Sequence, residues 1–237
     1  MNERQEKVLL ATIKEYSQTA VPVGSKILVN KYKILASPAT VRNDLAWLEK
    51  NGYLYQPHIS AGRIPTDKGY RYYVEKVSQP EGLSLSEQKR LQKELLKLKS
   101  QNVRLTRTAA KLLANFSDSL AVSGILDKKE FTDFGLKELL EEPEFQELDK
   151  VCQLVEVLDY VDEMFDKIIQ NIKTDETKIF IGKENPINKI ENYSMIVSPY
   201  RLRSGEKGIL ALIGTKRMQY VKNKSLIDYV KKMLNKM

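Results

Sequence analysis

The sequence predicts an α+β protein that begins with a winged helix-turn-helix and ends in a domain of mixed strands and helices. Residues 1–50 hold three short amphipathic segments, with a tight turn before the third. A β-prone run, a polar turn and a second short run follow them, which is the pattern of a small hairpin. Farther along, strand-like runs are flanked by helical segments, as is typical of α+β domains.

The three predicted helices have clear boundaries. The first covers Glu3–Thr19, and the second covers Ser25–Tyr32. The third begins at Ser37, a good N-cap residue, followed by Pro38 at the first helical position. It ends at Asn51-Gly52, a common C-terminal signal. Three short helices with a tight second turn predict a helix-turn-helix.

A hairpin and a fourth helix complete the predicted first domain, residues 1–77. The strands are expected around Tyr53–Tyr55 and Ile64-Pro65, with the turn Gln56–Arg63 between them. Such a hairpin is the wing of a winged helix. A tyrosine-rich helix then closes the domain near Val77.

Residues 78–117 are predicted to be a linker followed by one long helix. Pro80 and Gly82 indicate the linker, and Ser84 with Glu87 forms a capping-box pattern. Leucines then recur at heptad spacing, with one polar residue in the seam, the device that fixes register in coiled-coil dimers. The seam comprises Leu91, Leu95, Leu98, Asn102, Leu105 and Leu112. It predicts either a dimer interface or a helix packed on the chain's own C-terminal domain.

The third predicted domain covers residues 118–237. Its acidic first part, 118–149, shows no clear periodicity. An amphipathic helix is expected at Val151–Ile172, with Cys152 in its apolar phase and therefore buried. Strands are expected at Lys178–Ile181, Ser194–Val197 and Gly208–Ile213, and a closing helix at Leu226–Leu234.

The charge is segregated along the chain. The total is +8, but residues 1–76 carry 12 basic and 7 acidic groups, whereas residues 115–165 carry 4 basic and 14 acidic ones. A basic first domain favours a polyanionic partner, because neutralised phosphates release counterions. No apolar run reaches the ~20 residues of a membrane span, and the charged start does not resemble a secretory signal. A cytoplasmic protein without membrane contact is therefore expected.

The third helix carries the predicted base-reading face. Its apolar positions are spaced to face the domain core, which turns small residues, an arginine and an asparagine outward. Arginine suits guanine and asparagine suits adenine, each through two parallel hydrogen bonds. The predicted DNA-binding residues of this helix are Ser37, Ala39, Thr40, Arg42 and Asn43. An ordinary solvated helix face is the alternative.

The wing supplies the remaining predicted contacts. They are His58, Ser60, Gly62 and Arg63 around the turn, with Lys68 and Arg71 just beyond. Arg63 is expected against phosphate or in the minor groove. His58 has the alternative of capping a turn or packing on Tyr55. No catalytic or metal site is predicted, because the chain has one histidine and one cysteine and lacks phosphate-loop and dinucleotide fingerprints. No cofactor is expected either.

Two stretches resemble a known family. The run from Ser37 to Leu54 resembles the recognition helix of the HrcA family of heat-inducible transcription repressors, and the run from His58 to Val74 is similar to that family's wing and following helix. Ile59 stands where the family usually has threonine. Four later motifs follow in the family's order: Glu142–Phe145, Ile181–Asn185, Ser198–Tyr200 and Gly214–Tyr220. In the last of them, Thr215-Lys216 replaces the usual Pro-Thr.

The resemblance implies a dimeric repressor of heat-shock chaperone operons that binds an inverted-repeat operator, assisted by a GroEL-type chaperonin. It also implies a GAF-like C-terminal domain. Family members are typically longer, so this domain is expected in a reduced form, with its first strands and the domain inserted in it shortened or absent. Two other classes remain as alternatives. One is a regulator that senses a small molecule through its C-terminal domain. The other is an enzyme with a DNA-binding arm, which the missing nucleotide-binding glycines disfavour.

Overall fold

The chain folds into two compact units, Met1–Gln79 and Pro80–Met237. The computed structural model describes residues 1–77, 83–100, 105–159, 165, 167–169, 176–186 and 190–236. Its mixture of helices and sheet agrees with the predicted α+β class. Each unit has its own buried core, and we describe each by itself.

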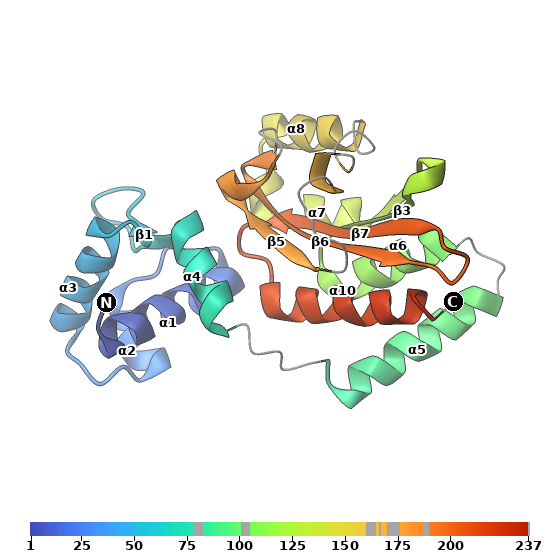
Figure 1. The fold of residues 1–237 in the computed structure, drawn as a ribbon. Helices are drawn as coiled ribbons and strands as arrows, with labels where there is room; N and C mark the ends of the chain where they lie inside the picture. Colours follow the sequence, from blue (N-terminus) through green and yellow to red (C-terminus); the bar gives the residue numbers. More distant parts are fainter. Residues whose placement is uncertain are drawn as a thin grey trace. The chain divides into compact units, whose positions relative to one another are not determined.

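The first unit holds four helices and a two-stranded hairpin among its described residues (Figure 1). The elements are α1 Glu3–Thr19, α2 Ser25–Tyr32, α3 Pro38–Lys50, β1 Leu54–Tyr55, β2 Ile64–Pro65 and α4 Asp67–Val77. They lie where the sequence predicts them. The strands are antiparallel, with Leu54 opposite Pro65 and Tyr55 opposite Ile64. The core of this unit includes the buried side chains of Val8, Leu9, Ile13, Leu28, Val41, Leu45, Leu48 and Leu54.

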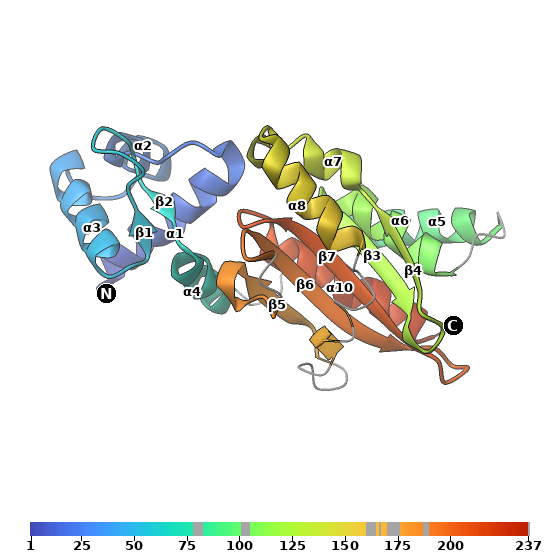
Figure 2. The same cartoon turned by 90° about the horizontal axis from the view of Figure 1, so that it is seen from above.

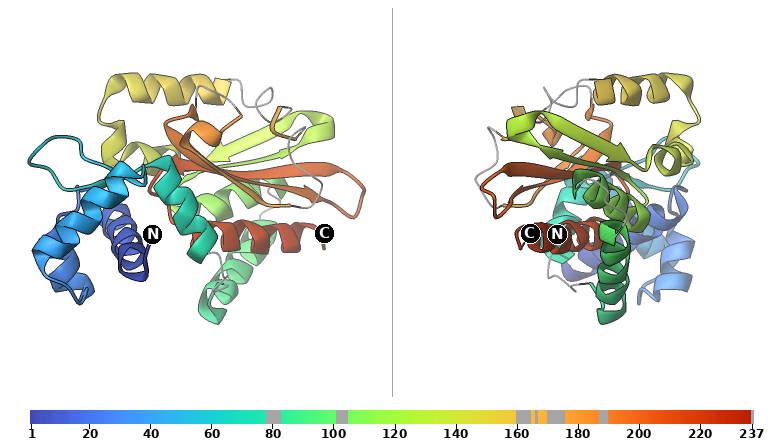
Figure 3. Two further views of the ribbon diagram at one scale, coloured as in Figure 1. Left: turned by 60° about the vertical axis from the view of Figure 1, so that its left-hand side comes forward. Right: turned by 90° about the vertical axis from the view of Figure 1, so that its right-hand side faces the viewer.

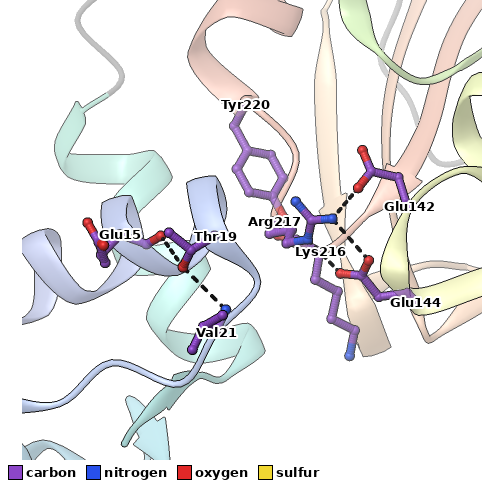
Figure 4. A network of polar contacts seen from close by, with 8 residues as sticks. All are labelled: Glu15, Thr19, Val21, Glu142, Glu144, Lys216, Arg217 and Tyr220. Atoms are coloured by element: carbon purple, nitrogen blue, oxygen red, sulfur yellow. Dashed lines mark hydrogen bonds and ion pairs between the residues drawn. The ribbon is translucent and has the colours of Figure 1, made fainter.

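A buried carboxylate joins the first two helices. Glu15 on α1 is 6% exposed and accepts hydrogen bonds from Lys31 Nζ at 2.6 Å and from Tyr32 Oη at 2.8 Å. The hydrogen bond from Lys31 lowers the pKa of Glu15, and burial together with Glu15 raises the pKa of Tyr32 to about 12. The same helix ends just beyond, where the Thr19 hydroxyl donates to the Glu15 carbonyl and accepts from the Val21 amide (Figure 4).

The lowered pKa of Glu15 predicts an acid-sensitive first unit. A carboxyl whose pKa is depressed by folding contributes stability above its unfolded pKa and loses it as the pH falls through the folded pKa. The loss therefore lies below the ordinary value of 4.5. We expect Glu15→Gln to flatten the acid side of the unfolding profile, measured by denaturant titration between pH 7 and pH 3. The exposed Glu3→Gln serves as control and should leave the profile nearly unchanged.

The second unit is built on a five-stranded antiparallel sheet with the order β4-β3-β7-β6-β5. The strands are β3 Leu120–Ile125, β4 Glu130–Phe134, β5 Lys178–Ile181, β6 Tyr193–Arg201 and β7 Lys207–Thr215. The helices are α5 Leu85–Ser100, α6 Leu105–Ser117, α7 Leu136–Leu140, α8 Leu148–Asp159 and α10 Tyr220–Leu234, and the short 3-10 turns are η1 Leu126–Lys128, η2 Pro143–Phe145 and η3 Gly182–Glu184.

Helices cover both faces of this sheet (Figure 3). Helices α6 and α10 lie side by side on one face and contact β3 and β6, respectively. On the other face, α7, α8 and η2 cover a continuous apolar cluster that includes Leu120, Val122, Phe145, Leu154, Met195, Val197, Ala211 and Ile213. The central strands β3 and β7 are therefore buried on both sides, which explains why they read as continuous apolar runs rather than alternating ones.

Motifs that resemble the HrcA family meet inside this second unit. Arg217, just after β7, bonds Glu142 and reaches Glu144 with an Nε–Oε1 distance of 2.7 Å (Figure 4). The neighbouring Phe145 ring stacks on Tyr193 at 5.5 Å between centroids. Asn185 donates its amide to the carbonyls of Gly182, Ile190 and Tyr193. These contacts therefore lie where strands β5, β6 and β7 begin or end.

The predicted connector, residues 78–117, differs from the structure. Helices α5 and α6 are separate elements within the second unit, rather than one helix between two domains. Of the predicted seam, Leu91 and Leu112 are fully buried in the single chain and Leu105 is half-buried. Asn102 and the side chains of Leu95 and Leu98 lie outside the described residues. At Leu91 and Leu112 the structure matches the intramolecular alternative, because α6 packs on β3 and β4 while α5 packs on α6.

Two other expectations are corrected. The acidic segment without a clear pattern holds β3, β4 and α7, so the first strands of the second unit are present. Cys152 is exposed rather than buried. Helix α8 turns Val151, Leu154 and Leu158 toward the core, and this phase leaves Cys152 on the outer side with Leu148 and Val155.

Candidate nucleic-acid interface

Helix α3 begins with a local structure that its sequence dictates. The Ser37 side chain accepts a hydrogen bond from the Thr40 amide at 3.1 Å, and the two hydroxyl groups lie 2.9 Å apart. Pro38 occupies the first turn, where its missing N–H costs nothing. The side chains of Ser37 and Thr40 therefore both help to hold the start of α3.

The outward face of α3 is free of bulky apolar groups. Ala39, Arg42, Asn43 and Ala46 are exposed and Thr40 is half-buried, whereas Val41, Leu45 and Leu48 lie in the core. The structure thus brings together three of the predicted contacts, Ala39, Arg42 and Asn43, on one solvent-facing surface, with Thr40 at its border. An arginine and an asparagine side by side between two alanines provide two bidentate hydrogen-bonding groups that close approach does not obstruct.

Sequence reasoning missed the ion pair that fixes this face. Asp44 is 4% exposed, and its carboxylate receives both Nε and Nη2 of Arg4, at 2.7 and 3.3 Å. The pair holds α3 against α1. The sequence does contain a signal for this pair. Asp44 lies at the helical spacing of the core residues Val41, Leu45 and Leu48, and a carboxylate at a core position requires a cationic partner.

The loop between β1 and β2, the predicted wing, is held from within by Gln56. Its amide nitrogen donates to the carbonyls of Ile59 and Ala61, both at 2.8 Å. His58 Nδ1 lies 3.1 Å from Ser60 Oγ, and both residues are exposed. The contact with Ser60 matches the alternative in which His58 caps the turn. The structure places His58 and Ser60 at the tip of the hairpin, where the sequence predicts DNA contacts.

Gly62 and Arg63 occupy positions different from those expected. They lie at the base of the β1–β2 hairpin, where Arg63 and Val23 exchange two backbone hydrogen bonds of 2.9 Å. The Arg63 side chain is only 13% exposed and its Nη2 lies 2.9 Å from Glu49 Oε2. Gly62 passes so close to Pro22 and Val23 that a Cβ atom would lie 2.5 Å from both backbone carbonyl carbons. These two residues pack the wing against the helices.

This arrangement predicts a structural role for Arg63. We expect Arg63→Ala to lower the free energy of unfolding of the first unit while the salt dependence of DNA binding stays unchanged, because its guanidinium is already paired. In a double-mutant cycle with Glu49→Ala, the two changes should couple by about 1 kcal/mol. A fall of about one unit in the slope of log K against log salt, without coupling to Glu49, would instead make Arg63 a phosphate contact.

Lys68 and Arg71 lie on α4, away from the turn. Lys68 Nζ donates to the Asn51 carbonyl at 2.9 Å and lies 4.4 Å from the centre of the Tyr53 ring. It thereby supports the end of α3, which stops at Gly52 in a left-handed conformation. Arg71 is half-buried and also has an interaction within the chain. Lys68 remains exposed and adds positive charge beside the C-terminal end of α3.

Other kinds of site find little support in the part of the chain that the structure describes. It contains no group of three His, Cys, Asp or Glu side chains arranged to hold a metal ion. None of its helices has the length and apolar character to cross a bilayer.

Comparison with known proteins identifies the family. Residues 78–223 match the family model described as the HrcA protein C-terminal domain. The chain belongs to the HrcA family. A heat-inducible transcription repressor HrcA of Pelotomaculum thermopropionicum is 26% identical, and the alignment covers 99% of this chain and 96% of the relative. That alignment runs over 334 positions although this chain has 237 residues, so HrcA relatives contain segments that are absent here.

The similarity to HrcA proteins is concentrated in a shorter region. The repressor HrcA of Desulforamulus reducens is 54% identical over 88 residues, which is 37% of this chain and 25% of the relative. A crystal structure of a hypothetical protein superposes with a TM-score of 0.74 at 21% identity, covering 99% of this chain and 98% of that one. The fold of the whole chain thus occurs in an experimental structure. Family membership makes this chain a transcriptional regulator and not an enzyme.

Proposed function

We propose that this protein is a DNA-binding repressor of heat-inducible genes, including chaperone operons, and that it acts by occupying its operator. The observation that carries the proposal is the outward face of α3, where Arg42 and Asn43 stand exposed between Ala39 and Ala46. The names of the HrcA relatives support the regulatory role. The affinity for DNA comes largely from phosphate contacts, and the selection of the operator sequence comes from α3.

The two units fit the domains that this function needs. We interpret the first unit as a winged helix-turn-helix, with α3 as recognition helix and the β1–β2 hairpin as wing. Its net charge is positive, with 12 basic and 7 acidic groups in residues 1–76. We interpret the second unit as a GAF-like domain, on the basis of its antiparallel five-stranded sheet with helices on both faces.

We propose a homodimer on an inverted-repeat operator, because each half-site of such an operator must meet an identical reading head. Leu91 and Leu112 are buried in the single chain, so the heptad seam does not support the dimer at these two positions. A dimer contact through the second unit is the better candidate. A GroEL-type chaperonin that assists the repressor remains an expectation from the family resemblance.

Footprinting on the chaperone promoters of the source organism tests the proposed function. The expected result is protection of an inverted repeat, with two protected half-sites related by a two-fold axis. Protection of random DNA at the same protein concentration would contradict it. The small-molecule sensor makes a different prediction, since a metabolite would then produce a saturable thermal shift and change the footprint.

A further inference from the structure

The tip of the wing presents an apolar side chain to solvent. Ile59 is 98% exposed, although burying an isoleucine is normally worth about 2 kcal/mol or more. The loop between β1 and β2 that carries it projects from the first unit (Figures 1 and 2). The favourable free energy of burying this isoleucine is therefore obtained only when a ligand covers it.

The loop holds Ile59 in a fixed position before any ligand arrives. Gln56 bonds the Ile59 and Ala61 carbonyls, and the Ala61 amide donates to the His58 carbonyl at 2.9 Å. The His58–Ser60 contact braces the other side of the turn. Such a preorganised tip loses little conformational entropy when it binds.

The chemistry of the tip does not suit phosphate. Residues 56–62 contain no lysine or arginine. The nearest arginine, Arg63, is paired with Glu49, and Lys68 donates to the Asn51 carbonyl. A tip without lysine or arginine, with an apolar apex between His58 and Ser60, fits the floor of a groove better than the sugar-phosphate backbone.

We propose that Ile59 enters the minor groove beside each half-site and selects A·T pairs there. The inference rests on the proposed function, in which α3 lies in the major groove and the hairpin reaches past the backbone to the adjacent groove. Apolar side chains can be inserted into the minor groove, and a G·C pair adds an amino group to its floor. One N–H of that amino group pairs with cytosine, and contact with Ile59 would strip water from the other N–H, which disfavours G·C.

Inosine provides the test, because an I·C pair presents the minor groove of an A·T pair and a major groove close to that of G·C. The flanking pairs are located by the footprint and then changed together to A·T, I·C or G·C. Wild-type protein should bind the A·T and I·C operators about tenfold more tightly than the G·C operator. Ile59→Ser should bind all three alike, and Ile59→Thr, the usual family residue, should behave similarly.

The matched control is Leu35→Ser, which removes an equally exposed apolar side chain from the turn between α2 and α3. It should keep the full preference for A·T and I·C. An Ile59→Ser variant that retains the wild-type preference would overturn the inference alone. Preference for A·T over both I·C and G·C would also overturn it, since that pattern reports the major groove. A wild-type protein that protects no inverted repeat would overturn the proposed function as well.

Discussion

Replacement of Arg42 or Asn43 by alanine should weaken operator binding by about 1–3 kcal/mol, roughly 5- to 150-fold, while binding to random DNA changes little. Both side chains are exposed on the outward face of α3 and neither belongs to the buried set that packs this helix. Their loss therefore removes base contacts without disturbing the fold. Fluorescence anisotropy on operator and scrambled duplexes, at matched salt, measures the difference.

A charge control separates base reading from general electrostatics. Lys14 is exposed on α1 of the same unit, so Lys14→Ala removes one positive charge from a different surface. This variant should lower the affinity for operator DNA and the affinity for random DNA slightly and equally. If Arg42→Ala also lowers operator and random affinity to the same extent, Arg42 contacts phosphate and does not read a base.

Gly62→Ala should destabilise the first unit by about 3 kcal/mol, the upper range for overpacking. The added Cβ would lie 2.5 Å from the carbonyl carbons of Pro22 and Val23 and 2.6 Å from the Pro22 oxygen. All three are backbone atoms and cannot rotate away. The chain must therefore shift, at the expense of the two hydrogen bonds between Val23 and Arg63. Chemical denaturation monitored through Trp47, the single tryptophan, measures the loss.

Gly24→Ala is the matched control for this change. Gly24 lies just after Val23 in an extended conformation that alanine adopts readily, and a Cβ there meets nothing within 4 Å. Because Gly24 is the N-cap of α2, where glycine is better than alanine, this change should cost at most about 1 kcal/mol. A Gly62→Ala variant as stable as Gly24→Ala would show that the wing base tolerates a shift, and that Gly62 serves the loop conformation alone.

Local signals account for the parts that the sequence predicted well. Ser37, Pro38 and Gly52 mark the ends of α3 because capping depends on neighbouring backbone groups alone. The outward placement of Arg42 and Asn43 follows from helical periodicity. The same reasoning failed for Cys152, since α8 has apolar residues on more than one side and its buried side depends on the sheet.

The sequence by itself determined the elements of the first unit, the solvent-facing side of α3 and the family of the chain. The tertiary structure alone decided which wing residues are available to a ligand. Arg63 and Glu49 are distant in sequence, and only the folded hairpin brings their charges to 2.9 Å. In the same way, β3 became recognisable as a strand only when paired with β4 and β7, because helices bury both faces of the sheet and remove the alternation that marks a half-exposed strand.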